Sequence, residues 1–342
     1  MVSIEENVNL FPYNTFRVTS TARYLVRIRS ISEIQELIHS EIFDRNKRLI
    51  LGGGSNVLLV GYIFDGLVIK NMISGINIIR QSDTNVELKI GGGENWHALV
   101  MYCLDNDFGG IENLTLIPGT VGAAPVQNIG AYGVELKDVL LLVEAIELST
   151  GKLRYFTRGE CRFGYRESIF KNEWKDKYFI SAVILKLSKG RHQLNTGYDS
   201  ISKVLNEQNI TVPTIQSVSE AVAKIRKSKL PNLDEVGSAG SFFKNPCIDR
   251  DKYHLMKLAH PTLPSFAHTT DSVTIPAAWL IELCRLKGKR LGNVGVYRNH
   301  ALVLVNYFDG TGDEVLVLAA DIHENVLRVF GISLIPEVNI IK

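Results

Sequence analysis

Residues 117–133 read IPGTVGAAPVQNIGAYG. This stretch holds four glycines and two prolines but no lysine, arginine, aspartate or glutamate. Glycine lets backbone N–H groups approach a ligand and adopt positive φ, whereas proline fixes its own φ. A flexible linker would carry charge and serine, and a core strand would exclude this much glycine and proline. We call residues 117–133 the cradle and predict a preshaped backbone loop that holds a ligand; composition alone also allows an ordinary irregular loop.

Two shorter glycine-rich turns precede the cradle, LGGGSN at 51–56 and IGGGEN at 90–95. Each follows an apolar, strand-like run. Tight glycine turns that present several N–H groups are one way in which proteins hold phosphates and pyrophosphates. Neither turn matches the G-x-G-x-x-G fingerprint, and the sequence contains no G-x-x-x-x-G-K-[ST] motif. The pattern therefore indicates phosphate-binding turns outside the Rossmann and P-loop classes.

The composition is typical of a large globular protein. Its 342 residues are 45% hydrophobic, which is enough for a sizeable core, and the length suggests two or three domains. A net charge of +2 argues against a nucleic-acid partner. The four cysteines lack C-x-x-C spacing and the eight histidines are scattered, so we expect reduced thiols and no metal site. Without a long apolar run or a signal-peptide pattern, the sequence predicts a cytoplasmic protein with no membrane partner.

The expected elements divide the chain into three regions. Residues 1–70 alternate strand and helix patterns and bring the first glycine turn to the end of a strand, where ligands gather. Residues 71–216 read as an α+β region of antiparallel strands around the cradle. Residues 217–342 alternate helices and strands. We expect two lobes and a C-terminal substrate-binding domain whose last strand returns to the active site.

Helix ends can be placed from local signals. The Ser-x-x-Gln or Ser-x-x-Glu spacing of a capping box predicts a helix over 32–43 capped by Ser32 and another that starts at Ser217. Proline at a first helical position and a glycine beyond the end predict a helix over 276–287. A longer helix over 313–330 is expected to stop at a glycine. A strand is expected over residues 14–28.

Three residues could carry chemistry. Arg166, in RFGYR, could bind a carboxylate through two parallel hydrogen bonds, or form a surface salt bridge. Ser241, in GSAGSFFKNP, has neither a G-x-S-x-G elbow nor a paired histidine, so it could donate a proton to a carbanion or simply cap a turn. Glu337, in IPEV, lies either at an exposed strand edge or buried for a functional reason. The basic run KIRKSK at 224–229 is by itself typical of a solvated helix end.

Together these stretches resemble one family, the long-type flavoprotein UDP-N-acetylenolpyruvoylglucosamine reductases of bacterial peptidoglycan synthesis. The resemblance covers nearly the whole chain in order, through Asn14-Thr15-Phe16, Gly52–Asn56, the cradle, residues 160–170, Lys229-Leu230-Pro231, residues 240–246 and Pro336-Glu337. It implies an α+β fold, with a two-lobed FAD-binding domain of the vanillyl-alcohol-oxidase/PCMH type and a C-terminal α/β substrate-binding domain. It also implies FAD as cofactor, NADPH as co-substrate and a monomeric enzyme.

The resemblance implies a role for each candidate residue. In this family a hydride passes from NADPH to FAD and then to UDP-N-acetylglucosamine enolpyruvate, which becomes UDP-N-acetylmuramate. Arg166 would bind the substrate carboxylate, Ser241 would protonate C2, and Glu337 would polarise the intermediate or relay a proton. FAD contacts would come from Gly52, Gly53, Gly54, Ser55, Asn56, Pro118, Gly119, Ala123, Ala124, Gly130 and Tyr132. Substrate contacts would come from Lys229 and Asn245, on the diphosphate, and from Tyr198, Phe266 and His300.

The sequence departs from the family pattern away from the three catalytic candidates. Phe266 replaces a tyrosine, Thr196-Gly197-Tyr198 reverses the usual Tyr-Gly order, Ala123-Ala124 stand where serine is frequent, and Asn339 stands where arginine is common. Two rival functions stay open. A flavin oxidase or dehydrogenase of the same fold is disfavoured by the C-terminal region, and a non-catalytic nucleotide-sugar-binding protein is disfavoured by the intact catalytic candidates.

Overall fold

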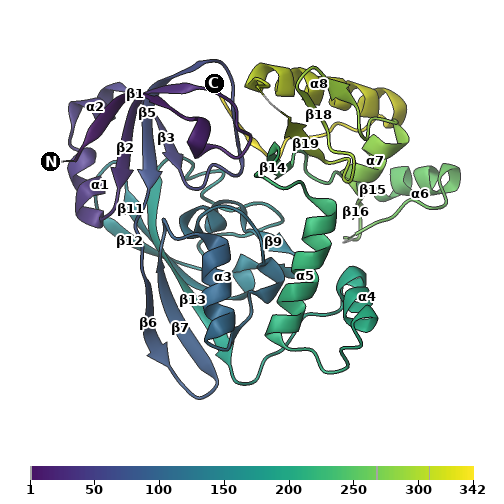
Figure 1. Ribbon diagram of the computed structural model, residues 1–342, viewed down its shortest axis with the longest axis horizontal. Helices are drawn as coiled ribbons and strands as arrows, with labels where there is room; N and C mark the ends of the chain where they lie inside the picture. The colour runs from purple at the N-terminus through teal and green to yellow at the C-terminus, as the bar shows by residue number, and fades with distance from the viewer. Residues whose placement is uncertain (1, 267–268, 308) are drawn as a thin grey trace. The chain divides into compact units, whose positions relative to one another are not determined.

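The computed structural model describes residues 2–266, 269–307 and 309–342 and forms two compact units (Figure 1). Each unit is assembled from chain segments that are distant in sequence. Unit 1 contains Met1–Val8, Thr21–Gly54 and Asp65–Ser228, and unit 2 contains Asn9–Ser20, Ser55–Phe64 and Lys229–Lys342. The three-part functional division with boundaries after residues 70 and 216 stays a prediction.

The first sheet of unit 1 places the first glycine turn. Its order is β1 (Ile4–Asn9), β2 (Thr21–Ile28), β5 (Ile63–Asn71) and β3 (Lys47–Leu51). Helices α1 (Ile31–Leu37) and α2 (Glu41–Arg45) connect β2 to β3, and β3 runs parallel to β5. Val26, Ile34, Phe43 and Leu67 belong to the buried core that holds these elements together. Since β3 ends at Leu51, the turn begins directly at the strand end.

The predicted helix over 32–43 is in fact two shorter helices, and its predicted cap is wrong. The Ser30 hydroxyl accepts a hydrogen bond from the backbone N–H of Glu33 at 3.2 Å, and the Glu33 carboxylate reaches back to a backbone N–H before the helix at 2.6 Å. The hydroxyl of Ser40 caps α2 in the same way. Gln35 is instead engaged with a backbone carbonyl elsewhere in unit 1. The charged Glu33 therefore completes the cap, two residues earlier than the Gln35 pattern indicated.

The second sheet of unit 1 is antiparallel, as predicted. Its order is β12 (Leu153–Thr157), β11 (Leu140–Glu147), β13 (Tyr178–Lys189), β7 (Asn85–Gly91) and β6 (Ile76–Gln81), and β8 (Phe108–Gly109) also pairs with β13. Helix α3 (Trp96–Asp105) covers one face of the long strands (Figure 1). Leu88, Leu99 and Val183 are fully buried in the core between them. This core supports the cradle from below because Val121 and Ala124 belong to it.

Short elements shape the cradle and its flanks. They are η2 (Glu112–Leu114), η3 (Val121–Gln127), η4 (Leu136–Asp138) and the hairpin of β9 (Gly130–Ala131) with β10 (Val134–Glu135). Asn128, in left-handed conformation with φ 46°, ends η3. Its side chain donates to the Gly164 carbonyl at 3.2 Å and accepts from the Lys137 N–H at 3.0 Å. The cradle is therefore an ordered structure and not an irregular loop.

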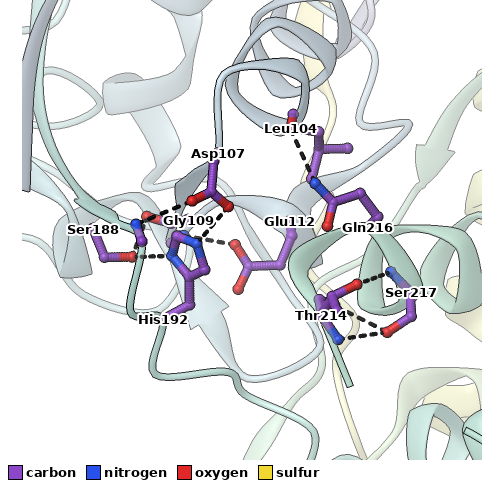
Figure 2. A network of polar contacts seen from close by, with 11 residues as sticks. Leu104, Asp107, Gly109, Glu112, Ser188, His192, Thr214, Gln216 and Ser217 are labelled. Carbon is purple, nitrogen blue, oxygen red and sulfur yellow. Dashed lines mark hydrogen bonds and ion pairs between the residues drawn. The ribbon is translucent and has the colours of Figure 1, made fainter. Parts of the chain in front are cut away.

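Unit 1 ends with α4 (Asp199–Glu207) and α5 (Ile215–Lys229). The predicted helix start at Ser217 is wrong, because α5 begins two residues earlier. Thr214 and Ser217 cap the helix reciprocally: each hydroxyl accepts the other residue's backbone N–H, at 3.2 and 2.8 Å (Figure 2). Gln216 donates to the Leu104 carbonyl at the end of α3, at 3.1 Å, which ties the two helices together (Figure 2).

Unit 2 is built around an antiparallel sheet in the order β14 (Gly237–Ser241), β19 (Val303–Asn306), β18 (Val294–Val296) and β17 (Arg290–Leu291). Two further pairs join β15 (Cys247–Asp249) to β16 (Ser272–Thr274) and, in parallel, β4 (Val57–Leu59) to β20 (Asn339–Ile341). The helices are α6 (Arg250–Ala259), α7 (Ala277–Leu283) and α8 (Gly312–Phe330), and α8 packs against β18 (Figure 1).

The helix predictions for unit 2 are partly confirmed. Gly331 ends α8 with φ 62°, as predicted. Thr311 and Glu314 form a capping box at the start of the helix, which the prediction did not include. Helix α7 is shorter than the predicted 276–287 because Arg285 adopts a left-handed φ of 57° and turns the chain away. Terminal residues of helices are the least predictable part of a sequence pattern.

The N-terminal segment Asn9–Ser20 belongs to unit 2, so the predicted strand over 14–28 begins only at Thr21. This segment contains η1 (Phe11–Tyr13) and folds around Asn14, whose amide donates to the carbonyls of residues 10 and 18 at 2.9 and 3.0 Å. Asn306 of β19 donates to the Phe16 carbonyl at 3.0 Å. A Cβ on Gly237 would lie 2.0 Å from that same carbonyl oxygen, so the segment packs directly on β14.

Candidate active site

The first glycine turn lies directly against the cradle within unit 1. A Cβ on Gly52 would stand 2.5 Å from the Thr120 Oγ1, and a Cβ on Gly53 would stand 2.6 Å from the Gly119 Cα. The ammonium group of Lys70 donates to the Gly52 carbonyl, and burial lowers its pKa. The backbone of the glycine turn therefore packs directly against the cradle, and only glycine, which has no Cβ, fits at this contact.

The second glycine turn supports the cradle. The N–H of Gly122 donates to the Gly92 carbonyl at 2.8 Å, and the N–H of Trp96 donates to the Gly119 carbonyl at 3.0 Å. A Cβ on Gly92 would lie 2.5 Å from the carbonyl oxygen of Ile180 on β13. Gly91–Gly93 thus support the cradle by close packing. This packing is enough to require glycine at these positions, without any contact to a ligand.

The turn and cradle fit the FAD expected from the resemblance. The hydroxyl of Thr120 is buried between Gly52 and the cradle, and no residue in the described part of the chain forms a hydrogen bond with it. A buried hydroxyl without a partner carries a desolvation cost that a bound polar group would remove. The cradle is also free of charged residues, which suits a flat flavin ring. The sequence prediction missed Thr120, although it is a polar residue in an otherwise small and apolar run.

Arg166 reaches the cradle from the loop after β12. It has a left-handed φ of 56°, and its Nη2 donates to the Gly130 carbonyl at 2.8 Å. Its guanidinium carbon lies 5.5 Å from the centre of the Tyr165 ring. The neighbouring Arg162 pairs with Glu173 at 3.0 Å on the surface. The structure therefore brings Arg166 to the predicted cofactor loop.

Unit 1 also contains a buried cation that sequence reasoning missed. Arg226, on α5, donates through Nη2 to the Leu116 carbonyl at 3.2 Å, while its Nε is buried and bonded to none of the residues described. Burial lowers the pKa of this guanidinium, and the nearby Tyr132 opposes that shift. The rings of Tyr132 and Tyr198 meet edge to face with centres 5.4 Å apart. The structure thus groups Tyr132 and Tyr198 beside Arg226, a residue to which the sequence prediction gave no role.

Ser241 and Glu337 come together in unit 2. Ser241 is the last residue of β14 and pairs with Val303. The next residue, Phe242, accepts a hydrogen bond through its carbonyl from the Glu337 N–H at 2.8 Å, and Phe243 bridges to Pro336. Glu337 is half-buried. The segments that carry the predicted proton donor and carboxylate are therefore adjacent and antiparallel.

The end of the glycine turn also binds the Glu337 segment. Asn56 donates through its amide to the Glu337 carbonyl at 3.4 Å. The backbone N–H and the side-chain amide of Asn339 both donate to the Asn56 carbonyl at 3.0 Å. Asn339, where the family pattern favours arginine, therefore holds the loop of Asn56 in place.

The remaining predicted substrate residues belong to unit 2. Lys229 is exposed, and its charge contributes, after burial, to lowering the pKa of His300. Asn245 caps α7 by accepting the N–H of Ala277 at 3.0 Å. The Phe266 side chain is exposed on the surface of unit 2. Among these residues, Lys229 and His300 lie close enough for the charge of Lys229 to act on the imidazole.

The described residues contain neither a candidate metal site nor a candidate membrane-spanning helix. No group of three or more histidine, cysteine, aspartate or glutamate side chains there could hold a metal ion. Within the same residues, every helix is too short or too polar to span a membrane.

Comparison with known protein families gives two matches. Residues 22–157 match the family described as "FAD binding domain", and residues 231–341 match "UDP-N-acetylenolpyruvoylglucosamine reductase, C-terminal domain". The match regions contain, respectively, the glycine turns with the cradle, and Ser241 with Glu337.

Two similar proteins of this kind are full-length matches. The UDP-N-acetylenolpyruvoylglucosamine reductase of Flavobacterium johnsoniae is 44% identical over 340 residues, covering 99% of this chain and all of the relative. The reductase of Amoebophilus asiaticus is 43% identical and covers both chains completely.

Solved structures show the same fold at lower identity. The UDP-N-acetylenolpyruvylglucosamine reductase of Thermus caldophilus superposes with a TM-score of 0.69 at 23% identity and covers both chains completely. The 6-hydroxy-D-nicotine oxidase of Arthrobacter nicotinovorans has a TM-score of 0.52 at 13% identity, covering 99% of this chain and 89% of the oxidase. The fold class predicted from the sequence is confirmed. From the full-length relatives it follows that the chain belongs to the UDP-N-acetylenolpyruvoylglucosamine reductase family and is an oxidoreductase with an FAD-binding domain.

Proposed function

We propose that the protein reduces UDP-N-acetylglucosamine enolpyruvate to UDP-N-acetylmuramate with NADPH as hydride source and FAD as hydride carrier, as a step in peptidoglycan precursor synthesis. Relatives named for this reductase span the full chain at 40–44% identity. The structural observation that carries the proposal is the pairing of the Glu337 segment with the end of β14 beside Ser241. As part of the proposal, we place the enzyme in the cytoplasm as a monomer.

The cofactor residues act by shape and by neutral hydrogen bonds. FAD, when bound, supplies the chemistry: it can accept a hydride and donate it again. Gly52, Gly53 and Gly54 would present their backbone N–H groups to the FAD pyrophosphate. The buried hydroxyl of Thr120 would form a hydrogen bond with the same group. Pro118, Gly119, Ala123 and Ala124 would line the ring in the charge-free cradle.

Arg166, Ser241 and Glu337 act on the substrate. Addition of a hydride to C3 of the enolpyruvyl group leaves negative charge at C2 and in the carboxylate. Catalysis requires groups that bind this charge more strongly as it develops. Arg166, held by the Gly130 carbonyl, would neutralise the carboxylate, and Ser241 would deliver a proton to C2. Glu337 would polarise the intermediate or relay that proton.

Lys229 and His300 suit the diphosphate end of the substrate. The exposed ammonium of Lys229 would meet a phosphate, while the neighbouring imidazole, kept neutral by burial, would donate or accept one hydrogen bond. Asn245 would add its amide from the start of α7. Phe266 and Tyr198 would each contribute an aromatic ring.

An anaerobic visible spectrum tests the proposal. The purified protein, loaded with FAD, should bleach on addition of NADPH and recover its yellow colour only when the enolpyruvyl sugar nucleotide is added. UDP-N-acetylglucosamine, which lacks the enolpyruvyl group, is the matched control and should give no recovery. Recovery with oxygen but not with the substrate would favour a flavin oxidase, and a protein that cannot bind FAD would favour the binding-protein alternative.

A further inference from the structure

The hairpin β9–β10 contains a turn that its own sequence disfavours. Ala131 pairs with Val134 and Gly130 with Glu135, which leaves Tyr132 and Gly133 as a two-residue loop. Both have positive φ, at 50° and 81°. This is the backbone of a type I′ turn, which favours Asn-Gly, and a bulky tyrosine in the left-handed region is strained. The turn must therefore be held by contacts from outside the hairpin.

Two asparagines supply these contacts. Asn113 is fully buried, and its Nδ2 donates both to the Tyr132 carbonyl at 3.0 Å and to the Asn195 carbonyl at 2.9 Å. Asn195 in turn donates its Nδ2 to the Gly133 carbonyl at 2.9 Å. The Oδ1 of Asn113 is buried without a partner in the described chain, so this residue bears a desolvation cost to supply both donors. We call Asn113 and Asn195 the asparagine clamp.

The clamp connects the turn to the segment 190–198, which leads from β13 to α4. The start of this segment has its own anchor, because His192 lies between the Ser188 hydroxyl at 2.8 Å and the Asp107 carboxylate at 2.9 Å (Figure 2). Its end carries Tyr198, whose ring meets that of Tyr132. The segment is thus held at its start by His192 and in its middle by Asn195, and its end places the Tyr198 ring against the turn.

The hairpin also carries the contact that holds the predicted catalytic arginine. The Gly130 carbonyl, two residues before Tyr132, accepts the hydrogen bond from Arg166. A shift of the turn would therefore move the rings of Tyr132 and Tyr198 relative to Arg166. Small displacements of positioning contacts reduce binding and rate strongly.

We propose that Asn113 and Asn195 are positioning residues, which hold Tyr132 in its strained turn so that the Tyr132 and Tyr198 rings meet the sugar-nucleotide substrate beside Arg166. This inference rests on the proposed reductase function. The resemblance assigns Tyr132 to FAD, but in this proposal its ring instead contacts substrate. That contact explains a tyrosine at a position that prefers asparagine, and the clamp offsets the strain.

The first test is Asn195→Ala, because Asn195 is only half-buried and the fold should tolerate the change. One lost hydrogen bond should raise KM for the enolpyruvyl sugar nucleotide about fivefold, with kcat changed by less than about twofold. Asn206→Ala, an exposed asparagine on α4, is the matched control and should leave both constants unchanged. In a background that carries both Tyr132→Ala and Tyr198→Ala, Asn195→Ala should have no further effect on KM, since it acts through those two rings. Full additivity of the two changes would overturn the proposal.

The second test separates the ring from the turn. Tyr132→Asn places the preferred residue in the type I′ turn, so the hairpin should keep slow amide hydrogen exchange while KM rises at least fivefold, about the effect of one lost contact. An unchanged KM would show that the ring has no role in binding and would overturn the proposal.

A third readout does not depend on the reaction. Amide exchange of residues 131–135 and 196–200 should become faster in Asn195→Ala and stay unchanged in Asn206→Ala. If the parent enzyme shows no substrate-dependent turnover, the proposed function fails, and this exchange measurement still decides whether the clamp exists. Unchanged exchange in Asn195→Ala would contradict the clamp itself.

Discussion

Ser241 is a hydroxyl at the end of a paired strand, and its role can be separated from that of the cofactor. Ser241→Ala should leave flavin reduction by NADPH nearly intact and slow reoxidation by substrate about 10²–10⁴-fold, the usual effect of losing a proton donor in the transition state. Stopped-flow absorbance of the two half-reactions measures both rates. Ser333→Ala, at an exposed site of the same unit, is the control. An equal loss in both half-reactions would exclude a specific donor role for Ser241.

A second residue-scale prediction concerns pH and His300. Burial, aided by the charge of Lys229, lowers its pKa in the folded protein below the ordinary value of 6.5. The unfolded chain therefore binds a proton first as the pH falls through about 6.5, so the folded state loses stability on acidification. His300→Gln should reduce the drop in Tm between pH 7.5 and pH 5.5, whereas His39→Gln, at an exposed position, should not. The same drop in the His300 variant would contradict the assignment.

At the scale of elements, the contact between the first glycine turn and the cradle gives a direct prediction. Gly53→Ala would place a methyl group 2.6 Å from the Gly119 Cα, so the two loops must separate. We expect the Kd for FAD to rise at least about tenfold, equivalent to roughly 1.4 kcal/mol of binding free energy. Gly159→Ala, which meets no atom within 4 Å, is the matched control. Flavin fluorescence titration measures both, and equal FAD affinity in the two variants would show that the loops can separate freely.

The elements also show where sequence patterns were sufficient. The capping box at Thr311 and the glycine at 331 fix α8 by local chemistry, so its prediction is confirmed. Near residue 30 two serines offered competing caps, and the charged Glu33 favoured Ser30 over Ser32. A local pattern names the candidates for a cap, but the stronger hydrogen bond selects among them.

At the scale of the whole molecule, the predicted fold class is confirmed, and the candidate residues Ser241 and Glu337 are found on adjacent segments. The sequence could not predict the tertiary contacts that join distant segments, such as the Asn306 amide on the Phe16 carbonyl. It also missed Thr120 and Arg226, because a buried donor or acceptor without a partner has no signature in a linear pattern. The resemblance to the family implied the roles of the candidate residues, and the structure showed which residues surround each of them.

The segment Asn9–Ser20 is synthesised more than 200 residues before β14 and β19, yet it packs with both strands. A ribosome adds about 5–20 residues per second, so more than ten seconds separate the synthesis of this segment from that of its partner strands. During that interval its apolar residues Leu10, Phe16 and Val18, fully buried in the finished protein, have no binding surface. We therefore expect nascent chains of this protein to be early clients of ribosome-associated chaperones, with the N-terminal segment as the binding site.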